Sequence, residues 1–134
     1  MTRINVVPPE ELDVKHLVAE YRELPRVFKL AFNAWREDRM PPSSKSYVLG
    51  KGHVQFFYDK LGFLRDRQRA LIAEMLRRGY NPTHTSVDFE IPCALLGSWQ
   101  PDAEALKINR QRLLERLSVR KQTKPATLEH SIVQ

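Results

Sequence analysis

Residues 20–28 read EYRELPRVF, and this short stretch decides the fold. Apolar side chains in and around it recur at steps of four, three and four, namely Leu17, Tyr21, Leu24 and Phe28. That spacing stacks them on one face of an α-helix, so we predict an amphipathic helix over residues 13–35 with Asp13 as its N-cap. Pro25 lacks an amide donor and its ring collides with the carbonyl four residues earlier, so the helix is expected to kink, unwind or end there.

The polar side of this predicted helix carries two kinds of charge. At about 100° per residue, His16, Glu20 and Glu23 fall within one narrow arc beside the apolar stripe. Arg22 and Arg26 lie on the far side of that acidic strip. A surface helix needs only one apolar and one polar face, so this third face raises the question of a site. An ordinary surface ion pair between Glu23 and Arg26 is the simpler alternative.

Two more amphipathic helices are predicted downstream. One covers residues 55–78 and is followed by Gly79, a residue that commonly ends helices. The other covers residues 102–119, directly after Pro101. Their apolar sides are formed by Phe57, Leu61, Leu64, Leu71 and Met75 in the first helix, and by Leu106, Leu113, Leu114 and Leu117 in the second.

The segments that join these helices are long and rich in turn-forming residues, so they are expected to be irregular. Three helices with such connections predict a small all-α domain over residues 1–120. Residues 121–134 have little apolar surface to bury and are expected to form a flexible tail.

Composition narrows the class of protein. The chain has 134 residues, 42% of them hydrophobic, and a net charge of +6, which favours binding to polyanions such as nucleic acid. No apolar run is long enough for a membrane span, and the N-terminus lacks a signal-peptide pattern, so a cytoplasmic protein is expected. A single cysteine allows no intrachain disulfide, and the four histidines lack metal-binding spacing, so we expect no metal and no other cofactor.

The chain begins MTRIN, and the small side chain of Thr2 favours removal of Met1 in a cell. Thr2 would then carry a free α-amine. The reference pKa of such an amine is ~7.7 to 8.0, so a sizeable share is neutral and nucleophilic at physiological pH, unlike a lysine. Most N-termini make no use of this property, so the amine alone identifies no site.

Three blocks of sequence together resemble one protein family. They are MTRIN at residues 1–5, AEYRELPRVF at residues 19–28, and GKGH followed by VQFFYDKLGFLRDRQ at residues 50–68. In residue type and in distance from the N-terminus they are similar to the pyrimidine-dimer DNA glycosylase/AP lyases of the bacteriophage endonuclease V type. The resemblance runs to about residue 120. The GKGH block lacks the GK[ST] ending of a Walker loop, so it predicts no nucleotide site of that kind.

This resemblance implies an all-α fold in which the N-terminal segment threads between helices. It also implies a chemistry that pairs the N-terminal α-amine with a helix glutamate, which by position are Thr2 and Glu23. The amine would attack the deoxyribose under the damaged base, form a Schiff base and cut the strand by β-elimination. The carboxylate would stabilise the positive charge that builds on the sugar. The implied partner is damaged double-stranded DNA, and a monomer is expected.

The resemblance also implies a set of DNA-contacting residues and the extrusion of a base opposite the lesion. His16 resembles a family residue near the site, and a helix-capping histidine is the alternative. The basic residues expected to contact DNA are Arg3, Arg22, Arg26, Lys51 and a ridge at steps of four on the last helix, Arg112, Arg116 and Arg120.

Two alternative functions remain open. The phage-type enzymes end in an aromatic and basic segment that contributes to dimer recognition, whereas no aromatic residue follows Trp99 here. An AP lyase or a glycosylase for another base lesion is therefore one alternative. The other is a non-enzymatic helical DNA-binding protein, although no short helix-turn-helix spacing is evident.

Overall fold

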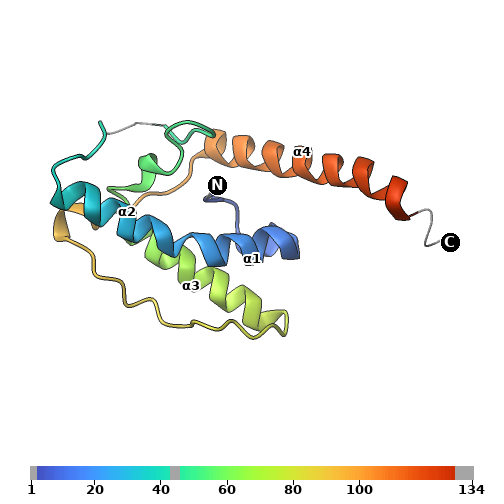
Figure 1. The fold of residues 1–134 in the computed structure, drawn as a ribbon, viewed down its shortest axis with the longest axis horizontal. Helices are drawn as coiled ribbons and strands as arrows, with labels where there is room; N and C mark the ends of the chain where they lie inside the picture. The colour runs from blue at the N-terminus through green and yellow to red at the C-terminus, as the bar shows by residue number, and fades with distance from the viewer. Residues whose placement is uncertain (1–2, 43–45, 129–134) are drawn as a thin grey trace.

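The computed structural model describes residues 3–42 and 46–128, with side chains up to residue 116. Over these ranges the chain is helical and contains no β-strand, which confirms the predicted all-α class (Figure 1). None of the helices in this part of the chain is long and apolar enough to cross a membrane. The α-helices are α1 (Val14–Glu23), α2 (Pro25–Arg36), α3 (Leu61–Arg77) and α4 (Ala103–Leu128), and the 3-10 turns are η1 (Pro9–Glu11), η2 (Gln55–Phe57) and η3 (Cys93–Leu95).

The helix predicted over residues 13–35 is present as α1 and α2, which meet at Leu24. Pro25 is the first residue of α2, where a missing amide is tolerated, and Leu24 keeps helical backbone angles of −56° and −41°. Pro25 cannot donate to the carbonyl of Tyr21, and that oxygen instead accepts a hydrogen bond of 3.1 Å from Gln68 Nε2 on α3. The proline therefore breaks the hydrogen-bond ladder without unwinding the chain.

The predicted apolar stripe forms the centre of the core. Leu17 and Leu24 are fully buried, and Phe28 is nearly so. Helix α1 packs on α3, and η1 also contacts α3. Residues 3–8, called the N-terminal segment from here on, run between α1 and α4, as the resemblance implied (Figure 1).

The helix predicted to begin at residue 55 begins later. Residues 55–57 form the 3-10 turn η2, and α3 starts only at Leu61, after Lys60 with its non-helical angles of −127° and 40°. The reason is a close approach from elsewhere in the chain. Gly97 lies so near that a Cβ on it would stand 2.2 Å from the carbonyl oxygen of Asp59, and its own carbonyl accepts from the amide of Phe63. A tertiary contact therefore overrides the apolar periodicity.

Helix α4 begins where predicted but ends later. The side chain of Asp102 accepts a hydrogen bond from the amide of Ala105, as an N-cap does. The helix continues past residue 119 to Leu128. In Figure 1 its C-terminal half extends beyond the other helices. The flexibility of residues 121–134 stays a prediction, and residues 129–134 lie outside the described residues.

Candidate active site

The N-terminal segment is held at both polar groups of Ile4. Its amide donates to Nε2 of His53 at 2.8 Å, and its carbonyl accepts from the hydroxyl of Tyr47 at 3.1 Å. The other ring nitrogen of His53 lies 2.8 Å from the carbonyl of Val48. Nδ1 must therefore carry the proton while Nε2 accepts, which defines a neutral imidazole. Burial lowers the pKa of His53 and favours this neutral form.

The GKGH block gives this histidine its position. Gly50 and Gly52 have φ values of 78° and 85°, in the left-handed region that side chains other than glycine rarely adopt. The amide of His53 closes the turn by donating to the carbonyl of Gly50 at 3.0 Å. The block is thus a tight turn that presents a buried histidine to the N-terminal segment.

The next residues of the segment are held by α4 and α3. Oδ1 of Asn109 accepts hydrogen bonds from the amides of Val6, at 2.6 Å, and Val7, at 3.1 Å. The carbonyl of Val7 accepts from the guanidinium of Arg67. The backbone from residue 4 to residue 7 is therefore fixed from three sides before it reaches η1.

Glu20 and Glu23, which share one arc of α1, have different environments. Glu20 is buried and paired with Arg67 through contacts of 2.9 and 3.1 Å. Glu23 is 31% exposed and lies 3.0 Å from NH1 of Arg26, which is itself largely exposed. Of the two glutamates, Glu23 is therefore the one that solvent can reach.

A cleft of about 190 Å³ lies between the N-terminal segment, α1 and α4. It brings together four residues that the sequence assigned to the site, Arg3, His16, Glu23 and Arg116. Asn5, Ala19 and Glu20 also line it. His16 lines this cleft, and its Nδ1 lies 2.5 Å from the N-cap carboxylate of Asp13.

Positively charged residues lie on the side of the cleft that Arg3 and Arg116 form. The pKa of Arg3 is lowered, first by partial burial and then by the positive charges of Arg112 and Arg116. The guanidiniums of Arg112 and Arg116 are therefore close enough to that of Arg3 to repel it. Such a cluster gains stability when an anion approaches it.

The remaining predicted residues lie outside the cleft. Arg22 borders a separate cavity, and Lys51 is exposed on the turn between Gly50 and His53. Thr2 lies outside the described residues, as does the side chain of Arg120, whose backbone belongs to α4.

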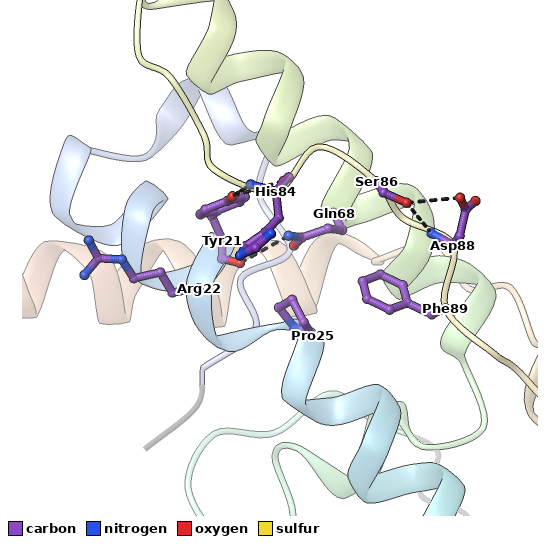
Figure 2. A pocket seen from close by; sticks show the side chains of 8 residues that line it. All are labelled: Tyr21, Arg22, Pro25, Gln68, His84, Ser86, Asp88 and Phe89. Atoms are coloured by element: carbon purple, nitrogen blue, oxygen red, sulfur yellow. Dashed lines mark hydrogen bonds between the residues drawn. The ribbon is translucent and has the colours of Figure 1, made fainter.

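The separate cavity has a volume of about 450 Å³ and lies where α1 meets α2 (Figure 2). Tyr21 joins α1 to the chain at His84 on the wall of this cavity. Its hydroxyl donates to the carbonyl of His84 at 3.0 Å and accepts from the amide of His84 at 2.7 Å. Phe89 stacks on Phe28 with ring centroids 4.1 Å apart. The guanidinium of Arg22 stands at the edge of the group in Figure 2. The walls thus offer aromatic faces with one cation at the rim.

Two residues that hold the N-terminal segment, Arg67 and Asn109, were not predicted from the sequence. A signal for both was present in the spacing. Arg67 stands between Leu64 and Leu71, and Asn109 lies four residues before Leu113, so each polar side chain falls on an apolar stripe. A polar residue in such a place is buried and therefore needs a partner.

The family model described as pyrimidine dimer DNA glycosylase matches residues 1–88. These residues include the N-terminal segment, α1, α2 and α3, and the GKGH turn. Helix α4 and its arginines lie beyond the matched range.

Proposed function

Because the chain belongs to the pyrimidine dimer DNA glycosylase family, we propose that it excises the damaged pyrimidine through a Schiff base on its own N-terminus and then cuts the strand. Membership of the family supports the glycosylase activity and the DNA substrate. The covalent route, the lyase step and the residue roles are proposals.

The observation that carries this proposal is the anchored N-terminal segment beside Glu23. Arg3 and Glu23 line the same cleft, and the backbone is fixed from Ile4 onward by His53 and Tyr47. Consecutive Cα atoms are about 3.8 Å apart, so a Thr2 amine next to Arg3 would be within reach of the same cleft. Anchoring of the backbone at Ile4 would favour attack, because it limits how far a nucleophile two residues earlier could move.

The proposed reaction begins with the neutral amine of Thr2 after Met1 is removed. The amine forms a bond to C1′ of the deoxyribose, and the electrons of the glycosidic bond leave with the base, which takes up a proton. Opening of the sugar ring gives a protonated imine. Loss of the C2′ proton then expels the 3′ phosphate by β-elimination.

Glu23 has two tasks in this scheme. Its carboxylate stabilises the positive charge that develops on the sugar as the base departs, and it can then move protons during ring opening and elimination. Its partial exposure suits contact with a substrate, whereas the buried Glu20 is committed to Arg67.

The positively charged residues are assigned to the DNA backbone. Arg3, Arg112 and Arg116 would hold phosphates that flank the lesion, and the exposed Lys51 would add a further contact. His16 faces the cleft near Glu23 and is assigned to the same surface. Arg22, Arg26 and Arg120 complete the proposed set.

The cavity beside Arg22 is proposed to receive the base opposite the lesion. Its volume of about 450 Å³ falls within the usual range for small-ligand pockets, and Phe89 offers an aromatic face to a planar base. A damaged pair stacks and pairs poorly, so its partner base costs less to extrude.

Borohydride trapping tests the proposal directly. The protein, with loss of Met1 confirmed by intact mass, is incubated with one duplex that contains a thymine dimer, one that contains an AP site, and an undamaged control of the same sequence. A covalent adduct on both damaged duplexes, mapped to Thr2, is expected. An adduct on the AP duplex alone would move the glycosylase assignment to another lesion. Absence of adducts on both would reject the Schiff base.

A further inference from the structure

Asn109 on α4 is completely buried. Its Oδ1 accepts hydrogen bonds from two consecutive amides, those of Val6 and Val7. Its Nδ2 donates to Oδ1 of Asn5 at 2.8 Å. One side chain thus binds three successive residues of the N-terminal segment. Any backbone amide could donate to Oδ1, but a shift by one residue would take the Asn5 side chain away from Nδ2, so the bond to Asn5 is the one that specifies the register.

The contact continues to the helix that carries Glu23. Nδ2 of Asn5 donates to Oε1 of Glu20 at 2.9 Å. Glu20 is three residues before Glu23 on α1, which is about one helical turn. Helix α4, the N-terminal segment and α1 are therefore connected by buried hydrogen bonds that start at Asn109.

We propose that Asn109 is a positioning residue that sets the register of the N-terminal segment and thereby the place of the N-terminal amine relative to Glu23. This inference rests on the proposed function. A slip of one residue would move extended backbone by about 3.3 Å, whereas misplacement by about 1 Å can cost 100-fold in rate. An asparagine suits this task because its amide accepts and donates at once.

The experiment compares three variants. Asn109→Leu has the same γ-branched shape, although it is larger, and cannot accept from Val6 or Val7. Asn109→Asp keeps acceptor oxygens for Val6 and Val7, but it replaces the donor to Asn5 with an acceptor and buries a negative charge, so it tests whether the donor is needed. Leu113→Ala, one turn along on α4, lowers stability without removing any hydrogen bond of the N-terminal segment and is the matched control. Asn109→Ser, a milder change, is prepared in case Asn109→Leu does not fold.

Three quantities are measured on each protein: the single-turnover rate of adduct formation on the AP duplex, the Kd for that duplex, and hydrogen exchange at the amides of Val6 and Val7. For Asn109→Leu or Asn109→Ser we expect the rate to fall about 100-fold, exchange to accelerate, and Kd to change by less than about threefold, because Arg112 and Arg116 remain. Asn109→Asp, which lacks the donor to Asn5, should also lose rate, and Leu113→Ala should keep the wild-type rate below its melting temperature.

The outcomes separate this inference from the proposed function. A wild-type protein that forms no adduct would overturn both. Normal adduct formation by wild type together with unchanged rates in the Asn109 variants would overturn the inference alone. Equal rate losses in Leu113→Ala and Asn109→Leu would also overturn it, because general destabilisation would then account for the effect.

Discussion

Arg67 on α3 holds Glu20 on α1 with two hydrogen bonds, from Nε to Oε2 at 2.9 Å and from NH2 to Oε1 at 3.1 Å. Both side chains are almost completely buried. The same guanidinium donates to the carbonyl of Val7, so one residue joins α1, α3 and the N-terminal segment. This ion pair distinguishes the two glutamates of α1. Glu20 stabilises the packing of α1 on α3, whereas Glu23 is partly exposed at the cleft.

Glu20→Gln should strongly destabilise the fold. The change removes the negative charge and leaves the Arg67 guanidinium buried beside a neutral amide. Breaking a buried pair in this way costs about 3–5 kcal/mol in the free energy of unfolding. Urea denaturation measures it, with Asp66→Asn as control, since the exposed pair of Asp66 with Arg69 contributes at most about 1 kcal/mol. If both variants lose a similar free energy of unfolding, the buried pair of Glu20 with Arg67 stabilises the fold no more than an exposed pair does.

Glu23→Gln should leave the fold intact and stop the chemistry. The side chain keeps its shape and loses the charge that stabilises the sugar in the transition state, so single-turnover base release should fall about 100-fold or more. The Kd for damaged duplex should not rise, because removal of an anion takes away no phosphate contact. Glu37→Gln, on the surface after α2, is the control. Unchanged base release in Glu23→Gln would remove Glu23 from the mechanism.

The local features of the fold could be read from the sequence. The spacing of Leu17 and Leu24 predicts the buried face of α1, and Pro25 predicts the break. Periodicity describes one helix at a time and cannot separate Glu20 from Glu23, which lie on one arc. The difference between them is made by Arg67, 47 residues further along the chain.

The long-range contacts could not be read in the same way. Asn109 is 103 residues from Val6, and only the packing of α4 against the N-terminal segment brings them together. The late start of α3 has a similar cause, since Gly97 approaches the chain at Asp59. Each of these contacts depends on where a second element docks, which apolar spacing does not encode.

Salt dependence should identify the arginines that contact DNA. Arg112→Ala and Arg116→Ala should each reduce the slope of log K against log salt by ~0.9, as expected for one lost phosphate contact. Arg110→Ala is the control on the same helix, because Arg110 is already paired with Glu11 through contacts of 2.9 and 2.8 Å. Binding is measured by fluorescence anisotropy over a salt series. Equal slopes for all three variants would contradict the assignment of Arg112 and Arg116 to phosphate contacts.

The stability of the fold should fall at acidic pH because of His53. Burial lowers the pKa of His53 in the folded protein below its ordinary value near 6.5. The positive charge of Arg3 acts in the same direction, while the Val48 carbonyl opposes it. As the pH falls through 6.5 the unfolded chain therefore binds a proton that the folded chain does not. The stabilising contribution of His53 is complete above that pH and is lost as the pH falls through the folded pKa.

Protonation would also place an N–H on Nε2, facing the amide of Ile4 that now donates to it. Urea unfolding at pH 7.5, 6.5 and 5.5 should show a decline of up to about 1.4 kcal/mol per pH unit from this group. His53→Gln should flatten that decline, since a glutamine does not titrate. His84→Gln, whose side chain is exposed, should keep the wild-type pH dependence. If His53→Gln and wild type decline in parallel, another group is responsible and the neutral imidazole is not what holds Ile4.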